Sequence, residues 1–215
     1  MNRVNVMNLD RILPPFSPLL RWALRSKQAQ REAQFSGVSL APGRVVFLGD
    51  SITEWTAWED WFPELPTTNR GIGGQAITHI HARLATAIHE PKAISLLIGT
   101  NDLHGLGQST DVDSIAEQMS SLVREIRRMA PDAALLINSV MPRSSHFRER
   151  ITRLNVHYRR IAEQNEAIYV DLWPVLAGSD GSIRPEYTAD GLHLSIEGYR
   201  AWVSALRPHL IAPGR

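Results

Sequence analysis

From Gly43 onward, short runs of β-branched and apolar residues alternate with longer amphipathic stretches. Parallel strands joined by helical crossovers produce this pattern, so the sequence predicts an α/β fold. About five runs have the length of strands, which is a usual number for one sheet. They cover residues 44–48, 67–70, 93–98, 133–138 and 167–171.

The segments between these runs carry apolar residues at helical spacing. One apolar stripe covers residues 115–129 and ends before Pro131, which cannot continue a helix. Similar stripes over 151–161 and 196–206 predict two more helices, the last with Ser195 as its N-cap.

Chain length favours one compact domain, predicted over residues 43–215, after an N-terminal extension over residues 1–42. Within the extension, a proline-containing lead-in precedes a basic helical stretch over residues 19–35. This helix could lie on a membrane surface or bind a partner. We expect instead that Leu20, Leu24 and their neighbours pack it onto the body, as helices with one apolar face usually do.

Charge and amino-acid composition exclude several classes of function. With 23 Lys+Arg against 22 Asp+Glu, the net charge of +1 shows no excess that would indicate nucleic-acid binding. The chain has no Cys, which excludes disulfides, thiolate zinc sites and a cysteine nucleophile. Charges and prolines interrupt residues 1–24 too often for a secretory signal, and no stretch reaches transmembrane length. We therefore expect a cytoplasmic protein without an integral membrane segment.

Polar residues follow the predicted strands at the edge where functional groups gather in parallel sheets. Ser51 comes directly after the first strand, although on its own it is more simply explained as the N-cap of the next helix. Asp190 precedes His193 by three residues, so its carboxylate can orient the imidazole through Nδ1 and leave the other nitrogen for serine. In isolation, a surface turn with an incidental histidine would be the better explanation, but the glycine inside this turn and the helix directly after it count against that alternative.

Acyl transfer also needs hydrogen-bond donors where negative charge develops on the carbonyl oxygen. Gly74 could bring a backbone N–H close to a substrate, because no side chain obstructs the approach. Asn101 could offer its side-chain amide from the end of the third strand. Taken singly, a flexible turn explains Gly74 better than an oxyanion role does, and an Asx-turn does the same for Asn101.

Four sequence blocks occur in one order: Gly-Asp-Ser-Ile at 49–52, Asn-Arg-Gly-Ile-Gly-Gly at 69–74, Gly-Thr-Asn-Asp at 99–102 and Asp-Gly-Leu-His at 190–193. In order and spacing they resemble the blocks of the SGNH hydrolases, also called GDSL esterases. The resemblance covers roughly residues 44–210. It implies a three-layer α/β/α sandwich with a flavodoxin-like parallel sheet, which agrees with the alternating pattern.

The same resemblance implies the site residues. Ser51 is the nucleophile, His193 the general base and acid, and Asp190 the partner that orients the histidine. The backbone N–H groups of Ser51 and Gly74 and the side chain of Asn101 form the oxyanion hole. No metal or organic cofactor is required.

Gly71-Ile-Gly-Gly74 and Val140-Met-Pro-Arg143 are similar to the small acetylhydrolases related to platelet-activating-factor acetylhydrolase catalytic subunits. We therefore expect a serine esterase for carboxylic esters with a short acyl group such as acetyl, acting through an acyl-enzyme. Many members carry Asp after the oxyanion glycine, where this chain has Gln75, which puts the local hydrogen bonding in doubt.

The expected partner is a small-molecule ester, with neither nucleic acid nor metal. The same acyl-enzyme would also serve an acyltransferase or a thioesterase, and a binding module that retains a dead site is the nonenzymatic alternative. A homo-oligomer is compatible with the sequence. The candidate substrate-binding residues are Asp50, Trp55, His104 and Arg143.

Trp55, Trp58 and Trp61 follow the nucleophile at spacings of three and six residues, which predicts one face of a helix. They could wall the acyl or alcohol site or pack in the core. His79 and His81 could be taken for metal ligands, but side chains two residues apart on a helix point in different directions.

Overall fold

A computed structural model describes residues 18–211, with side chains from Leu24 onward. Its five strands form one sheet in the order β2-β1-β3-β4-β5, and all four pairings are parallel. The predicted flavodoxin-like sheet is therefore confirmed. The strands are β1 (Val45–Gly49), β2 (Thr67–Gly71), β3 (Ala93–Leu97), β4 (Ala134–Asn138) and β5 (Ile168–Val170).

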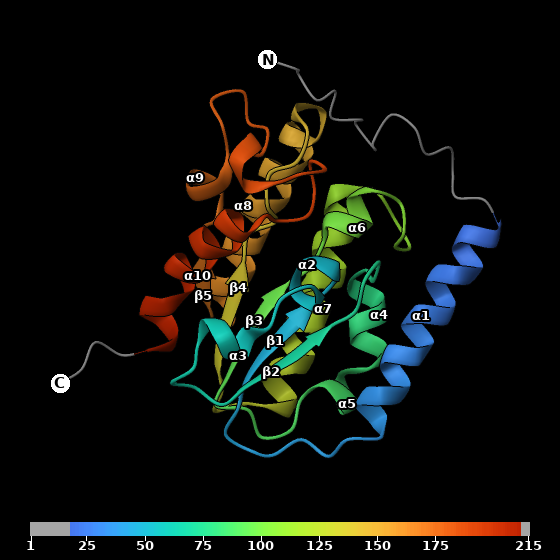
Figure 1. Cartoon of the computed structure of the whole chain (residues 1–215), viewed down its shortest axis with the longest axis vertical. Helices are drawn as coiled ribbons and strands as arrows, with labels where there is room; N and C mark the ends of the chain where they lie inside the picture. Colours follow the sequence, from blue (N-terminus) through green and yellow to red (C-terminus); the bar gives the residue numbers. More distant parts are fainter. Residues whose placement is uncertain (1–17, 212–215) are drawn as a thin grey trace.

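Helices cover both faces of the sheet and produce the predicted three layers (Figure 1). One face packs against α4 (Ile77–Ala82), α5 (Leu84–Ala87), α7 (Val112–Met129) and α8 (Arg148–Gln164). The other face packs against α3 (Trp58–Trp61), α9 (Trp173–Leu176) and α10 (Ile196–Leu210). The remaining elements are short α2 (Ser51–Glu54) and α6 (Thr100–Leu103), and the 3₁₀ turns η2 (Ser145–Phe147) and η3 (Pro185–Tyr187).

Sequence signals mark the start of two long helices of the body, α7 and α10, and the end of α7. Helix α7 starts after Asp111, whose carboxylate accepts the N–H of Ser114, and it stops just before Pro131. Ser195 caps α10, as predicted, by accepting the N–H of Gly198 at 3.2 Å. The apolar stripes of α7 and α8 face one side of the sheet, and that of α10 faces the other.

The three tryptophans after the nucleophile do not share a helical face, so this prediction is wrong. Helix α2 ends at Glu54 and α3 begins at Trp58, so the chain turns between the first and second ring. Trp58 is fully buried and stacks on Phe47 with ring centroids 3.7 Å apart, whereas Trp55 is 60% exposed. The spacing of the tryptophans favours one continuous helix, but the packing of Trp58 against the sheet determines the conformation of this segment.

An additional helix, α1 (Pro18–Ser36), runs beside α4 and α5 at one edge of the molecule (Figure 1). Phe35 anchors its carboxyl-terminal end, with the guanidinium groups of Arg70 and Arg31 over its ring at 4.3 and 4.7 Å. Gln75 also donates a 2.7 Å hydrogen bond to Glu32 of the helix. Residues 24–36 thus contact the body through both polar and aromatic interactions.

Residues 1–17 of the predicted lead-in and the side chain of Leu20 lie outside the described residues. The division of the chain at residue 42 stays a prediction. Among the helices within residues 18–211, none has the length and apolar character to span a bilayer.

Candidate active site

The carboxyl ends of three neighbouring strands meet at the candidate site. Gly49 of β1 lies opposite both Gly71 of β2 and Leu97 of β3, so the three strands end at one level. Successive strands are added on one side of β1 for β2 and on the other side for β3, and α/β sheets form their ligand crevices at such a switch point. Ser51 follows β1 and Asn101 follows β3 at this point.

Asp50, rather than Ser51, caps the helix that follows β1. Its carboxylate accepts the N–H of Ile52 at 3.0 Å, which leaves the Ser51 hydroxyl available for another partner. The turn also requires Gly49, since a Cβ there would lie 2.2 Å from Oγ1 of Thr53 and 2.4 Å from the Leu97 carbonyl oxygen. This geometry removes the simpler explanation of Ser51 as a helix cap.

Three side chains form a continuous hydrogen-bonded chain. The Ser51 hydroxyl lies 2.9 Å from Nε2 of His193, and Nδ1 of His193 lies 2.6 Å from Oδ2 of Asp190. With the proton on Nδ1 shared with the carboxylate, Nε2 can accept the serine proton. The arrangement is that of a nucleophile, a base and a group that orients the base.

Backbone contacts hold the Asp190 carboxylate in place. Its Oδ1 accepts the N–H of Leu192 at 2.9 Å and that of His193 at 2.7 Å. Burial raises the pKa of Asp190, but the bonds from the His193 ring and these two amides together lower it below the ordinary value. Asp190 is therefore ionised at neutral pH. Thr188 supports the turn by donating a 2.7 Å hydrogen bond to the His193 carbonyl oxygen.

Trp55 covers the histidine ring. Its indole stacks on His193 with ring centroids 3.9 Å apart and 22° between the planes. Trp55 also lines the pocket at Ser51, the place predicted for it as a substrate-binding residue. The stack restricts the rotation of the imidazole and offers a π face to an imidazolium.

The candidate oxyanion donors lie around the same pocket. Gly74 has a φ of +73°, a conformation that favours glycine, and Asn101 Nδ2 donates to the Gln75 carbonyl oxygen at 2.9 Å. That bond fixes the amide group and leaves its second N–H for a ligand. In the part of the chain that the structure describes, no backbone acceptor takes the N–H of Ser51 or of Gly74.

The pocket at Ser51 has a volume of about 380 Å³ and a largely apolar lining. Three of its lining residues, Leu24, Lys27 and Gln28, come from α1, and sequence reasoning did not identify them as site residues. The body contributes Ser51, Glu54, Trp55, Ile72, Gly73, Gly74, Asn101, Leu106, Leu192 and His193.

Gln75 occupies the position where many family members carry Asp, and its hydrogen bonds are well defined in the structure. Its side chain accepts a 2.7 Å hydrogen bond from Nε of Arg83, while its Nε2 donates to Glu32. Burial lowers the pKa of Arg83 to about 10, which keeps the guanidinium charged at neutral pH. Gln75 therefore links the oxyanion loop to α1 and to Arg83, the residue between α4 and α5, a role that no local sequence signal marks.

Two buried carboxyl groups lie beneath the site. Burial raises the pKa of Asp50 to about 7, with Asp102 nearby adding to the rise and the Ile52 N–H opposing it. Burial likewise raises the pKa of Asp102 to about 6, against the hydrogen bond from the Ile77 N–H. Asp50 is fully buried, so it does not reach the pocket surface as its predicted substrate-binding role requires.

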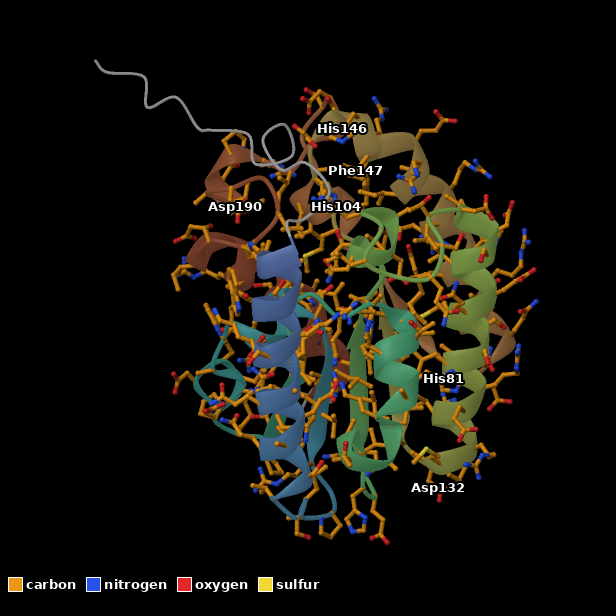
Figure 2. All side chains as sticks on the ribbon, turned by 90° about the vertical axis from the view of Figure 1, so that its right-hand side faces the viewer. His81, His104, Asp132, His146, Phe147 and Asp190 are labelled. Carbon is orange, nitrogen blue, oxygen red and sulfur yellow. The ribbon has the colours of Figure 1, made fainter. Side chains whose placement is uncertain are left out.

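The other two candidate substrate-binding residues lie away from the pocket at Ser51. Arg143 is only 3% exposed, and its guanidinium lies 4.4 Å from the Phe147 ring centroid and 3.3 Å from Thr100 Oγ1. His104 tilts against Phe147 at 6.2 Å, and Figure 2 shows it beside Phe147 and His146. Neither Arg143 nor His104 lines the pocket.

Within residues 18–211, no three His, Cys, Asp or Glu side chains are grouped so that they could hold a metal ion. His79 instead accepts the N–H of Ala76 through Nδ1 at 3.1 Å.

Comparisons with known proteins agree with the geometry. Human platelet-activating factor acetylhydrolase IB subunit alpha1 is 30% identical over 178 residues, which cover 78% of this chain and 75% of that protein. A structure from Streptococcus pneumoniae, described as a platelet activating factor, has a TM-score of 0.81 at 26% identity and covers 90% of this chain and 97% of its own.

A variant of an acetyl xylan esterase from Geobacillus stearothermophilus shares the fold, with a TM-score of 0.66 at 19% identity over 81% of this chain and 99% of its own. The family model described as GDSL-like lipase/acylhydrolase matches residues 47–201, which include the end of β1, all of β2 to β5, and the Ser51, Asp190 and His193 positions. The chain therefore belongs to the GDSL-like lipase/acylhydrolase family.

Proposed function

We propose that this acylhydrolase is a serine esterase that removes short acyl groups, acetyl above all, from a small-molecule ester. The observation that carries the proposal is the hydrogen-bonded chain from Ser51 through His193 to an ionised Asp190 at the floor of an open pocket. This chain supplies a nucleophile and a proton acceptor in one place.

In the first half of the reaction, Ser51 Oγ attacks the ester carbonyl carbon while Nε2 of His193 takes the hydroxyl proton. The carbonyl oxygen gains negative charge and accepts hydrogen bonds from the N–H groups of Ser51 and Gly74 and from Asn101 Nδ2. The intermediate then collapses. His193 returns its proton to the departing oxygen, and the alcohol leaves an acyl group on Ser51.

In the second half, His193 takes a proton from a water molecule that attacks the acyl-enzyme carbonyl carbon. The same three donors stabilise the second intermediate, and its collapse gives the carboxylic acid and free Ser51. Asp190 keeps its charge in both halves, because it orients the ring and stabilises the imidazolium without taking the proton.

The preference for a short acyl group has two supports. The named acetylhydrolase and acetyl xylan esterase relatives act on acetyl groups. The pocket of about 380 Å³ must also hold both the acyl group and part of the alcohol, which limits the space for a long chain.

A series of p-nitrophenyl esters from acetate to decanoate tests the proposal, with Ser51→Ala as the matched control. We expect kcat/KM to be highest for acetate or butyrate and turnover by Ser51→Ala to fall at least 1,000-fold, because the acyl-enzyme cannot form. Undiminished turnover by folded Ser51→Ala would contradict the nucleophile. A maximum at eight carbons or longer would contradict the acyl preference.

A further inference from the structure

The peptide group between Gly73 and Gly74 contains one of the proposed oxyanion donors. Its nitrogen belongs to Gly74 and its carbonyl to Gly73, and no cis peptide bond occurs among residues 18–211. In a trans peptide, the C=O and N–H bonds point in opposite directions within one plane. Whatever holds the Gly73 carbonyl therefore also sets the direction of the Gly74 N–H.

A side chain of α1 holds that carbonyl. Nε2 of Gln28 donates a 2.9 Å hydrogen bond to the Gly73 carbonyl oxygen, across 45 residues of sequence. Leu24, one helical turn earlier, lies so close to Gly74 that a Cβ at this glycine would be 2.9 Å from both of its methyl groups. The helix thus packs directly against this peptide group.

The body holds the other side of the same segment. Oε2 of Glu54 accepts the Gly73 N–H at 2.6 Å, and a Cβ at Gly73 would lie 3.6 Å from Cβ of Ser51. Arg31 of α1 in turn lies 3.6 Å from Oε1 of Glu54. Two adjacent glycines have wide backbone freedom, so these outside contacts decide which way the peptide plane faces.

We propose that Gln28 is a positioning residue, which directs the Gly74 N–H into the oxyanion hole through its hydrogen bond to the Gly73 carbonyl oxygen. This inference rests on the proposed function. It means that α1 contributes to catalysis by orienting an oxyanion donor. Without Gln28 the Gly73–Gly74 peptide can rotate, and a rotated peptide turns a donor away from the developing negative charge.

Gln28→Met tests the proposal, because methionine has a similar length and volume but no N–H donor. Removal of one oxyanion donor costs about 100- to 1,000-fold in rate, and a peptide that is misdirected only part of the time costs less. We expect kcat for p-nitrophenyl acetate to fall roughly 10- to 50-fold, with KM changed less than threefold. The rate constant for labelling of Ser51 by a fluorophosphonate should fall in parallel, since the phosphoryl oxygen occupies the same hole.

Two variants serve as controls. Gln30→Met changes an exposed glutamine of the same helix and should behave as wild type. Gln28→Lys restores a donor of sufficient reach and should recover a large part of the lost kcat. Thermal unfolding of each variant shows whether the fold is intact.

Three results distinguish the hypotheses. If Gln28→Met has a kcat and a labelling rate within twofold of wild type, Gln28 does not position the donor, while the proposed function stands. A loss confined to KM would likewise overturn the positioning role and assign Gln28 to substrate binding. No labelling of folded wild type at Ser51 would overturn the proposed function and this inference with it.

Discussion

Trp55 is exposed to solvent and also contacts the catalytic histidine. It is a large aromatic residue that is 60% exposed, and it nevertheless makes a close stack with His193. Burial does not explain its position, because most of the indole still faces solvent. The contact with the imidazole is therefore the interaction that fixes the ring, and in return it limits the rotation of His193 about its side-chain bonds.

Replacing Trp55 by Leu should lower kcat/KM for p-nitrophenyl acetate about three- to tenfold, because an aromatic pair contributes about 0.5–1.5 kcal/mol beyond area burial. Trp55→Phe keeps a stacking partner and should retain most of the activity. Steady-state kinetics of the two variants check the expectation. Equal activity of Trp55→Leu and wild type would show that the stack does not support catalysis.

Some residues of the site could be identified from the sequence, and others could not. Asp190 and His193 could be paired because one tight turn contains both, and Ser51 and Asn101 because parallel strands end at one edge. Gln28 could not be found this way. Its hydrogen bond to Gly73 depends on how α1 packs against a loop 45 residues away, and no local pattern encodes that contact.

Helix α1 is attached to the body mainly through the end that carries Phe35. The guanidinium groups of Arg31, Arg70 and Arg83 lie 4.3–5.8 Å from the centroid of its ring. Their positive charges are offset by Glu32, which accepts from Gln75, and by Glu54, which lies beside Arg31. One aromatic ring thus joins the helix to β2 and to the junction of α4 and α5 through stacked cations.

Phe35→Ala should loosen α1 without unfolding the body. Truncation of a buried Phe typically costs about 3–5 kcal/mol, and here the loss falls on the docking of one peripheral helix. Hydrogen exchange should therefore become at least about tenfold faster for the amides of residues 24–36, with α7 unchanged. Val38→Ala, at an exposed site just after the helix, is the control. Unchanged protection of α1 would show that Phe35 is not its anchor.

At the level of elements, the sequence predicted strands and long helices well and short helices poorly. Four of the strands are short apolar runs between turn residues, with the polar β2 as the exception, and α7 with its apolar stripe continues for 18 residues, so local pattern and packing largely agree. The tryptophan segment is different. Trp55, Thr56 and Ala57 separate two four-residue helices there, because Trp58 packs into the core and its Nε1 donates to the Thr53 carbonyl oxygen at 3.0 Å.

The two carboxyl groups buried beneath the active site affect the stability of the whole molecule. Asp50 caps α2 and Asp102 accepts the first amide of α4, so each carboxyl group fixes the start of a helix. Their carboxyl groups are nevertheless removed from water, which opposes ionisation. As a result, global stability depends on the protonation of groups that do not touch the substrate.

The sign of this dependence follows from the raised pKa of Asp50, about 7 in the folded protein against an ordinary value of 3.8. Between these two values the folded state binds more protons than the unfolded state. The stabilisation due to Asp50 is therefore complete below pH 3.8 and is lost as the pH rises through about 7. Asp102 acts in the same direction, with its loss complete at a lower pH, just above about 6.

Asp50→Asn removes this dependence while keeping an oxygen for the Ile52 N–H. Relative to wild type, the free energy of unfolding of the variant should rise between pH 4.5 and pH 8 by an amount on the order of 2–4 kcal/mol. Urea unfolding at several pH values measures the difference. Asp132→Asn, which removes an exposed carboxylate at the other end of the molecule from Asp190 (Figure 2), is the matched control. A difference between Asp50→Asn and wild type that stays constant with pH would show that Asp50 is ionised in the folded protein throughout this range.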